Sequence, residues 1–457
     1  MSDVMTSPLN IGDTRIVQVK SIGINGEGIA FVQRQAVFIP GALPGEEVHI
    51  RVVRVEKTYA VATLLKILKA SPDRVSPPCP IYERCGGCQL QHLSYQGQLK
   101  AKEALIRESF ARYTGLQSIP LRPIIGMEHP WAYRNKAQLM TGQIGQTVIA
   151  GLYAMGTHRL IDLSDCPVQH PRVNETILKT KKMIAALHVP VYDEKKKRGR
   201  VRTIVARVSL LTEEVQLTLV LAEDYFPEAK DFVRAIRQSL PYVVSIHMNV
   251  QDRHTPLVFG EKTRLLWGKE KIEEALGRER YELSPRAFFQ LNPLQTTRLY
   301  ALVEEAAGLT GQESVVDAYA GVGTIALTLA PYAREVRGIE SVPEAVKDAE
   351  RNIRRAGYDH VHMTLGRAEK VMQRWSKSGY KPDVVVVDPP RSGLEPAMIQ
   401  AILSLAPKRL VYVSCNPSTL AKNAQALLKG GYRLKWVRPV DMFPQTAHVE
   451  SCALFTR

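Results

Sequence analysis

The sequence predicts an α/β protein of three parts, because three stretches of the chain show different strand and helix patterns. Residues 9–67 hold short strands separated by glycine turns, which is typical of a small barrel of the OB type. Residues 68–280 begin with a linker and a helix and continue mostly as strands. From residue 281, apolar strands alternate regularly with helices, which predicts a Rossmann-like, doubly wound parallel sheet. The expected domains are therefore 9–67, 68–280 and 281–457.

The first part has the alternating polarity of strands with one buried face. Gly23, Gly26 and Gly28 form a turn after the first strand, and Gly45 precedes the longest one. We expect strands at 15–19, 30–32, 36–40, 48–55 and 59–67. Such barrels often bind nucleic acid, and the alternative is a barrel that only braces the neighbouring domain.

The linker after the barrel is rich in cysteine. Cys79, Cys85 and Cys88 lie close together, and Cys166 lies far downstream beside Pro167. Six cysteines in the whole chain are too few for a disulfide scaffold, so we expect these thiols to bind metal or do chemistry. Three close thiolates and one remote one favour an iron–sulfur cluster. The alternative is structural zinc, which more often has two Cys-x2-Cys pairs or histidine ligands.

The central part combines a helix with many strands and a basic segment. We expect a helix over 94–113, packed on the C-terminal domain, and strands that include 148–153, 201–208 and 214–221. The run Lys195–Arg202 contains six lysine and arginine residues. Such runs are usually solvated loops, but the charge of the whole chain makes this one a candidate phosphate contact.

Composition favours a polyanionic partner. The chain has 61 Lys and Arg against 45 Asp and Glu, a net charge of +16 and a pI near 9.5, which suits the release of counterions from a nucleic acid. The alternative is a basic surface without a partner. No apolar run is long enough to span a bilayer, and the first residues lack the apolar region of a signal peptide. We therefore expect a cytoplasmic monomer that does not bind membranes or DNA.

The C-terminal part carries polar residues at the ends of its predicted strands. The expected strands are 314–317, 335–340, 383–388 and 409–414, and helices over 342–356 and 395–405 are among those between them. Asp317 opens Asp-x-x-x-Gly-x-Gly at the end of the first strand, and glycines there let the backbone close on a ligand at the helix N-terminus. The motif is neither a dinucleotide fingerprint nor a P-loop. An acid before Gly-x-Gly suits a ligand with a cationic amino-acid end, such as S-adenosylmethionine, and Glu340 is suited to accept ribose hydroxyls.

Three further residues suggest chemistry at the same edge. Asp388 ends a buried strand and is followed by Pro-Pro-Arg-Ser-Gly, which holds the chain extended. Cys415 follows the strand 409–414 and is itself followed by Asn-Pro, and Glu450 lies 35 positions later. By itself Cys415 is more simply a small core residue. A thiol at a strand end, where such folds bind ligands, is nevertheless a candidate nucleophile.

These motifs, taken in order, resemble those of the RNA 5-methyluridine methyltransferases. The matching residues are Asp-x-x-x-Gly-x-Gly, Asp-Pro-Pro-Arg-x-Gly, Ser-Cys-Asn-Pro and His-Val-Glu. With the N-terminal barrel, which is similar to a TRAM domain, and the four cysteines, the chain resembles the branch that acts on 23S ribosomal RNA. The resemblance implies a class I methyltransferase fold, with Gln290, Tyr319, Glu340 and Asp388 binding S-adenosylmethionine. It also implies Cys415 as nucleophile, Glu450 as base, and a 4Fe-4S cluster on Cys79, Cys85, Cys88 and Cys166.

The expected chemistry explains why a thiol and a carboxylate are both needed. Thiolate addition to carbon 6 of uracil makes carbon 5 nucleophilic enough to take a sulfonium methyl group. Glu450 would then remove the carbon 5 proton as general base. The target uridine must be unpaired or flipped out, and Phe288 or Phe289 is a candidate stacking surface, although both are equally typical of a core.

Three alternatives remain at this stage. A tRNA uracil-5-methyltransferase would use the same motifs. An amino methyltransferase also uses an acid–proline–proline segment but has no use for Cys415, and its segment usually ends in an aromatic residue where this chain has Arg391. A non-catalytic RNA-binding assembly factor would combine the barrel, the cluster and the basic surface without binding S-adenosylmethionine.

Overall fold

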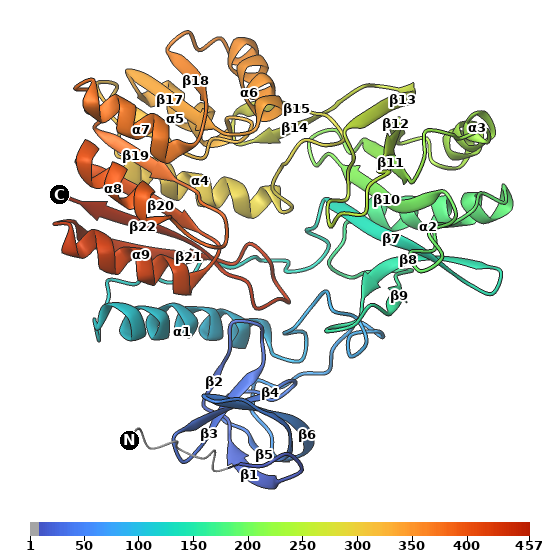
Figure 1. Cartoon of the computed structure of the whole chain (residues 1–457), viewed down its shortest axis with the longest axis horizontal. Coiled ribbons are helices and arrows are strands. Elements are labelled where there is room, and N and C mark those ends of the chain that lie inside the picture. Colours follow the sequence, from blue (N-terminus) through green and yellow to red (C-terminus); the bar gives the residue numbers. More distant parts are fainter. Residues whose placement is uncertain (1–8) are drawn as a thin grey trace.

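A computed structural model describes residues 9–457, and Figure 1 shows a barrel, a central domain and a C-terminal domain joined by connecting segments. The barrel has the strand order β1-β5-β6-β4-β3-β2. Its strands are β1 (Thr14–Gln18), β2 (Ser21–Ile22), β3 (Gly28–Val32), β4 (Gln35–Ile39), β5 (Glu47–Val55) and β6 (Tyr59–Lys69). The sequence predicted five strands; the sixth is the two-residue β2, which pairs with β3 across the glycine turn.

Helix α1 (Tyr95–Thr114) connects the barrel to the rest of the protein. The Ser94 hydroxyl caps its first turn by accepting a hydrogen bond from the Gly97 amide, and Gly115 ends it with a left-handed backbone at φ 74°. The buried side chains Ile106 and Phe110 pack into the core of the C-terminal domain. In Figure 1, α1 lies between the barrel and α9 (Pro417–Lys429).

The central domain is a seven-stranded sheet with the order β13-β12-β11-β10-β7-β8-β9, and helices α2 and α3 pack on it. Strands β10 and β11 are buried along their whole length. The elements are β7 (Lys136–Ile144), β8 (Thr147–Tyr153), β9 (Leu160–Asp162), α2 (Pro171–Ala186), β10 (Val201–Val208), β11 (Val215–Leu221), α3 (Ala229–Ser239), β12 (Val243–Val250) and β13 (Lys262–Gly268).

The basic run at the start of β10 is not a continuous solvated loop, which corrects the sequence-based interpretation. Residues 195–198 are exposed. Arg200 is instead buried and bound to Glu223 and Glu228, at 3.2 and 2.6 Å. Arg202 is also buried and donates to two backbone carbonyls. Because Arg200 and Arg202 are buried, only 195–198 remain as a candidate phosphate contact.

The C-terminal domain contains a seven-stranded sheet with the order β18-β17-β16-β19-β20-β22-β21. Hairpin β14–β15 packs in the same core, so the boundary expected at residue 281 falls within β15. The remaining elements are β14 (Ile272–Leu276), β15 (Glu279–Leu283), α4 (Pro293–Ala307), β16 (Ser314–Asp317), α5 (Thr324–Leu329), a 3-10 turn (Ala330–Tyr332), β17 (Glu335–Glu340), α6 (Pro343–Ala356), β18 (Val361–Leu365), α7 (Ala368–Lys377), β19 (Val384–Val387), α8 (Pro396–Leu405), β20 (Arg409–Ser414), β21 (Arg433–Val440) and β22 (Glu450–Thr456).

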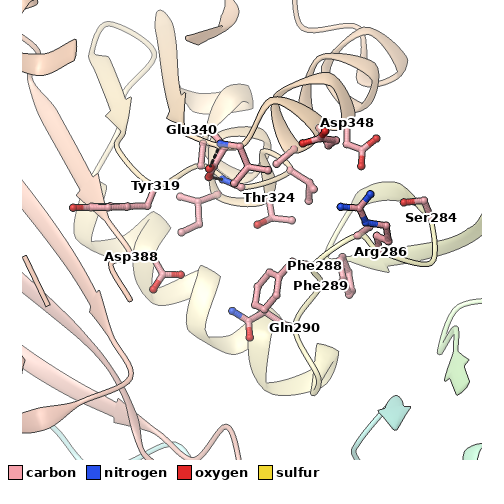
Figure 2. Close-up of a pocket in the computed structure, with 18 of the residues that line it drawn as sticks. Ser284, Arg286, Phe288, Phe289, Gln290, Tyr319, Thr324, Glu340, Asp348 and Asp388 are labelled. Atoms are coloured by element: carbon pink, nitrogen blue, oxygen red, sulfur yellow. Dashed lines mark hydrogen bonds between the residues drawn. The ribbon is translucent and has the colours of Figure 1, made fainter. Parts of the chain in front are cut away.

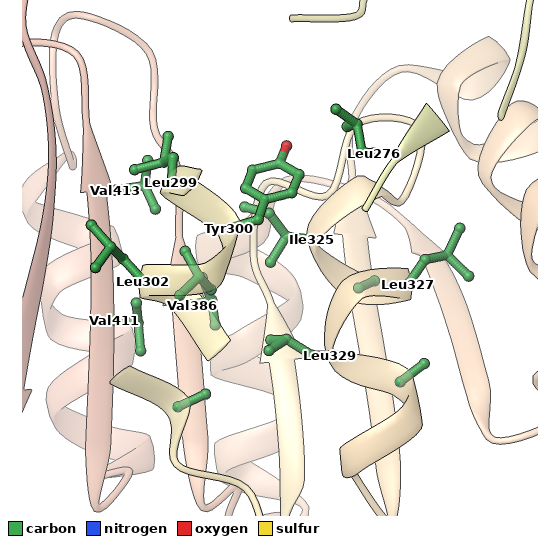
Figure 3. Packing of buried hydrophobic residues seen from close by; sticks show 14 of the residues in the cluster. Leu276, Leu299, Tyr300, Leu302, Ile325, Leu327, Leu329, Val386, Val411 and Val413 are labelled. Atoms are coloured by element: carbon green, nitrogen blue, oxygen red, sulfur yellow. The ribbon is translucent and has the colours of Figure 1, made fainter. Parts of the chain in front are cut away.

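Both faces of this sheet are covered by helices. Residues of α4, α5 and α6 pack on one face, and residues of α1, α7, α8 and α9 pack on the other. Figure 3 shows the first face, where Leu299 and Leu302 of α4 meet Val386, Val411 and Val413 of β19 and β20. Strands buried on both sides are continuous apolar runs, which is why they could be predicted from the sequence.

The sheet is mixed and not wholly parallel, which corrects the sequence-based prediction. Five strands, β16, β17, β18, β19 and β20, are parallel to one another. Strand β22 runs antiparallel to both β20 and β21. Only residues 441–449 join β21 to β22. A connection this short cannot hold the crossover that a parallel neighbour requires, so the chain turns back. Among the described residues 9–457, no helix is long and apolar enough to cross a membrane.

Candidate active site

Five acidic or thiol side chains lie at one edge of the C-terminal sheet. Asp317 and Glu340 are the last residues of β16 and β17, and Asp388 and Cys415 directly follow β19 and β20. These strands are parallel, so their carboxyl ends meet at the same edge. Glu450 reaches this edge differently, because it is the first residue of the antiparallel strand β22.

The antiparallel pairing of β20 with β22 makes Cys415 and Glu450 neighbours at the edge of the sheet. Ser414 is opposite Ser451 in the ladder, so the residues that flank this pair, Cys415 and Glu450, leave neighbouring strands on the same side. The predicted nucleophile and base are therefore brought together although they are 35 positions apart in the sequence.

A cavity of about 1020 Å³ opens at this edge. Its wall includes all six side chains predicted for catalysis and cofactor binding: Gln290, Tyr319, Glu340, Asp388, Cys415 and Glu450. In the view of Figure 2, Glu340 lies at one end of the cavity, and Asp388 and Gln290 lie opposite. The cavity is large enough for a ligand of drug size, since such pockets usually measure about 300–1,000 Å³.

The Glu340 carboxylate is held firmly by backbone amides. One oxygen accepts a hydrogen bond from the Gly321 amide at 3.0 Å, and the other accepts from Ser341 and Val342 at 2.6 and 2.8 Å. Gly321 and Gly323 both have left-handed backbones, at φ 54° and 84°, which glycine adopts without strain. The glycine turn and the carboxylate are thus built as one unit, with an acceptor group fixed at the cavity wall.

Asp317 is buried beneath this turn and is absent from the cavity wall. One of its oxygens accepts a hydrogen bond from the Ala326 amide at 3.0 Å, which joins β16 to the first turn of α5. Burial, together with the nearby Asp388, raises the pKa of Asp317 to about 7. Asp317 therefore stabilises the glycine turn through its hydrogen bond with α5 and does not face the cavity.

Burial makes the carboxyl groups at the centre of the cavity weak acids. It raises the pKa of Asp388 to about 7. It also raises the pKa of Glu450 to about 8, with a further contribution from Asp388. A carboxylate with such a pKa accepts protons near neutral pH better than an ordinary glutamate, as a general base must. The pKa of the Cys415 thiol is raised to about 11 by burial and by Glu450 and Asp388.

Arg391 is a site residue that the sequence analysis did not identify. Its charge lowers the pKa values of both Cys415 and Glu450 and so opposes part of the effect of burial. Its guanidinium donates a hydrogen bond to Nδ1 of His448 at 2.7 Å, and its carbonyl accepts one from Asn416 at 3.1 Å. The position directly after Asp-Pro-Pro was the available signal, because that segment was already expected to reach the cavity.

The two adjacent phenylalanines have different environments. Phe289 is buried, and its ring lies 5.8 Å from the ring of Tyr281. Both residues line the cavity, but Phe288 is 71% exposed (Figure 2). Only Phe288 is therefore accessible to stack on a base. The neighbouring Gln290 is held through its carbonyl, which accepts a hydrogen bond from Asn135 of the central domain at 3.3 Å.

Tyr319 lies between the main cavity and a smaller one of about 160 Å³. The smaller cavity is also lined by Glu340, Gly366 and Pro390. Burial raises the pKa of Tyr319, so its hydroxyl stays protonated near neutral pH. Tyr319 therefore lines both cavities as a neutral side chain.

The four cysteines predicted as cluster ligands line a separate cavity of about 200 Å³ between the linker and the central sheet. The Gly87 amide points at the Cys85 sulfur, at 3.4 Å. Within residues 9–457, no three or more His, Cys, Asp or Glu side chains are arranged to hold a single metal ion. Cys452 is fully buried in the core of the C-terminal domain, as expected for a packing residue.

Comparisons with known proteins found matches along nearly the whole chain. A model of the tRNA (uracil-5-)-methyltransferase family matches residues 94–457, and a TRAM domain model matches residues 8–65. A protein of Halalkalibacterium halodurans described as an RNA methyltransferase is 50% identical over 438 residues, 95% of each chain. Another of that description from Listeria innocua is 45% identical over 99% of each chain. The crystal structure of the Pyrococcus abyssi tRNA (uracil-54, C5)-methyltransferase with S-adenosyl-L-homocysteine is similar with a TM-score of 0.77, 28% identity and coverage of 97% and 100%.

Proposed function

Since the chain belongs to the tRNA (uracil-5-)-methyltransferase family and is an S-adenosylmethionine-dependent RNA methyltransferase, we propose that it methylates carbon 5 of a specific uridine in 23S ribosomal RNA. The observation that carries the proposed mechanism is that the expected cofactor residues, the thiol of Cys415 and the carboxyl of Glu450 line one cavity. Family membership excludes the two alternatives of an amino methyltransferase and a non-catalytic assembly factor.

Gln290, Tyr319, Glu340 and Asp388 are proposed to bind S-adenosylmethionine. The amide-held carboxylate of Glu340 supports this assignment, because a fixed carboxylate can accept both ribose hydroxyls without losing side-chain entropy on binding. The buried Asp388 supplies a carboxylate near the centre of the cavity, where it can orient the methyl donor or the N–H edge of uracil. Calorimetry with S-adenosylmethionine tests these positions one by one.

The proposed reaction begins with the Cys415 thiolate. Its Sγ–H proton is lost to solvent, and the thiolate attacks carbon 6, so the carbon 5–carbon 6 double-bond electrons move into an enolate. Carbon 5 then attacks the sulfonium methyl group, and the methyl–sulfur bond breaks with its electron pair remaining on sulfur to form S-adenosylhomocysteine. The positive charge of Arg391 favours the thiolate and thereby the first step.

Glu450 is proposed to complete the reaction. It removes the proton from carbon 5, the electrons of that bond re-form the double bond, and the carbon 6–sulfur bond breaks to release the Cys415 thiolate. With labelled S-adenosylmethionine and an rRNA transcript, Cys415→Ala should transfer no methyl group, and retained transfer would refute the covalent mechanism. Glu450→Gln should accumulate a covalent protein–RNA adduct on denaturing gels, and absence of the adduct would refute the base assignment.

Cys79, Cys85, Cys88 and Cys166 are proposed to hold a 4Fe-4S cluster that cross-links the linker to the central sheet. Their shared cavity of about 200 Å³ supports a group larger than one ion. Iron and sulfide analysis of anaerobically purified protein tests this, with Cys85→Ser as the variant that loses both. Stoichiometric zinc without iron would refute the cluster.

The choice of 23S rRNA depends on the sequence resemblance, because the TRAM domain and the four cysteines together are typical of that branch. A tRNA substrate is the second candidate, favoured by the similarity along the whole chain to the Pyrococcus abyssi enzyme, whose substrate is tRNA. Mapping 5-methyluridine in both RNAs from a strain that lacks the gene separates the two. A uridine in rRNA that loses its methyl group supports the proposal, and loss confined to tRNA supports the alternative.

A further inference from the structure

The segment 441–449, which leads into Glu450, is irregular but almost entirely buried. Asp441, Gln445 and Val449 are each at most 2% exposed. Irregular backbone normally lies at the surface, because its amides and carbonyls have no partners from a helix or a sheet. A buried loop must therefore find its hydrogen bonds elsewhere, and the origin of those bonds shows what controls its position.

Gln445 takes part in five of these hydrogen bonds. Its carbonyl accepts from the amides of Gln89 and Leu90, at 3.0 and 2.9 Å. Its amide donates to the side-chain oxygen of Gln98 at 2.9 Å, and its own side-chain oxygen accepts from the Gln98 amide group at 2.9 Å. Its side-chain nitrogen donates to the Pro130 carbonyl at 3.4 Å.

The backbone of Gln445 is also unusual. Its φ of 71° lies in the left-handed region, which costs a residue with a side chain about 1 kcal/mol or more. Such a conformation persists only where the surroundings hold it, and here the surroundings come from two distant segments. Gln89 and Leu90 directly follow Cys88, and the buried Gln98 lies on α1, where it also donates to the carbonyls of Leu90 and Leu93.

From Gln445 the contacts continue to the reacting groups. The Thr446 hydroxyl donates to the Phe443 carbonyl at 2.7 Å, which closes a turn whose Phe443 side chain lines the cavity. His448, three residues after Gln445, accepts the hydrogen bond from Arg391, and Glu450 follows two residues later. The Tyr133 hydroxyl adds a further hydrogen bond to the Pro444 carbonyl at 2.9 Å.

We propose that Gln98 and Gln445, whose side chains are paired, are positioning residues that hold the Glu450 carboxylate in place for proton removal. They connect the loop before Glu450 to α1 and to the cysteine segment, residues 79–90. This inference rests on the proposed role of Glu450. The cysteine segment and the catalytic base are thereby mechanically connected. Neither glutamine contacts the reacting atoms, so neither is a catalytic residue.

A displaced base has a specific kinetic consequence in this mechanism. Glu450 acts only after the methyl group has been transferred, so its displacement slows elimination and leaves the earlier steps intact. Gln98→Ala should therefore lower kcat by roughly 10- to 100-fold, the usual effect of a misplaced catalytic group. The methylated covalent adduct should accumulate, while the Kd for S-adenosylmethionine stays unchanged. A loss of folding alone would abolish the adduct and cofactor binding together.

The experiment compares four full-length variants with wild type by adduct formation on denaturing gels, single-turnover kinetics and calorimetry. Gln98→Ala removes one side chain of the pair within a helix. Gln445→Asn introduces a residue that tolerates the left-handed backbone and keeps a side-chain amide, but this side chain is too short to reach Gln98. Gln216→Ala is the control, since this buried glutamine also donates two hydrogen bonds, at 3.4 and 3.3 Å, but to Ser245 and Leu283, which lie outside the loop 441–449. Glu450→Gln is the reference for a blocked base.

The outcomes separate this inference from the proposed function. Accumulated adduct in Gln98→Ala or Gln445→Asn, with none in Gln216→Ala, supports the positioning role. Adduct in Glu450→Gln but wild-type turnover in both loop variants overturns the positioning role alone. A folded Glu450→Gln protein without adduct overturns the base assignment and the positioning role with it. If Gln98→Ala fails to bind S-adenosylmethionine, the adduct level of Gln445→Asn decides whether the positioning role holds, because α1 is unchanged in that variant.

Discussion

Lys102 and Asp441 form a fully buried ion pair whose disruption should strongly destabilise the protein. Both side chains are 0% exposed, and the Lys102 ammonium lies 2.5 Å from one Asp441 oxygen. The same ammonium donates to the Phe443 carbonyl at 3.1 Å. Burial lowers the pKa of Lys102, and the attraction of Asp441 opposes this shift. Replacing Lys102 by methionine keeps the length of the side chain but leaves Asp441 buried without its counter-charge.

The expected cost follows from this geometry. Removing one partner of a buried pair typically costs about 3–5 kcal/mol, because the remaining charge stays in a medium that solvates it poorly. For a domain of 150–250 residues, each kcal/mol lowers the midpoint of thermal unfolding by about 2–4 °C, so the shift should be roughly 6–20 °C. In Lys102→Met/Asp441→Leu no buried charge remains, so much of the loss should be recovered.

Thermal unfolding followed by circular dichroism measures this prediction. Lys196→Met is the matched control: its side chain is 77% exposed, its ammonium lies 3.8 Å from Asp193, and an exposed pair contributes at most about 1 kcal/mol. A Lys102→Met protein that unfolds at the wild-type temperature would refute the assignment of a stabilising pair. A double variant that is less stable than Lys102→Met would refute the argument that the orphaned charge causes the loss.

The remaining predictions concern the cavity. Arg391→Met should raise the pH at which iodoacetamide alkylates Cys415, because Arg391 lowers the pKa of that thiol; an unchanged midpoint by mass spectrometry would contradict this. Release of methylated RNA in single turnovers should speed up as pH rises through about 8, because Glu450 must be deprotonated to act; a flat profile would exclude it as the base. Phe288→Ala should raise the KM for RNA by roughly 5- to 150-fold through lost stacking, with the Kd for S-adenosylmethionine unchanged. An equal rise in the KM for RNA and in the Kd for S-adenosylmethionine would indicate a structural role. Glu340→Gln should weaken S-adenosylmethionine binding by roughly 10- to 150-fold in calorimetry, and wild-type affinity would remove Glu340 from the site.

Much of the C-terminal fold was predictable because the strands at the centre of its sheet, β16, β19 and β20, are buried on both faces. The strands expected at 314–317, 335–340 and 409–414 have those limits in the structure. Such strands are short apolar runs, and glycine, proline or acidic residues end them abruptly. The prediction of an RNA methyltransferase is likewise confirmed by the family to which the chain belongs. Both successes depend on local sequence, where the relevant residues are adjacent in the chain.

The antiparallel strand β22 could not be predicted in this way. Its apolar pattern identifies a strand but carries no information about which neighbour it pairs with or in which direction. The direction follows from the short connection 441–449, and the register follows from packing between β20 and β21. The prediction of a parallel sheet was therefore wrong for β22, the strand that begins with the predicted base Glu450.

The same distinction applies to charged and aromatic residues. Lys195 and Arg200 belong to one basic run, yet Lys195 is exposed and Arg200 is buried against two glutamates. Phe288 and Phe289 are adjacent and both line the cavity, yet Phe288 is 71% exposed and Phe289 is buried. Residue type alone does not reveal on which side of a folded surface a side chain lies, because burial depends on partners that are distant in the sequence.

The sequence by itself determined the class of fold, the family and the candidates for the reactive groups, because turn residues, apolar runs and motifs act over a few neighbouring positions. The tertiary structure alone decided that Cys415 and Glu450 share one cavity, that Arg391 acts on both, and that the loop before Glu450 is held by Gln98 from α1. Those relations depend on strand pairing and packing across hundreds of positions, and their energies exist only once the chain has folded.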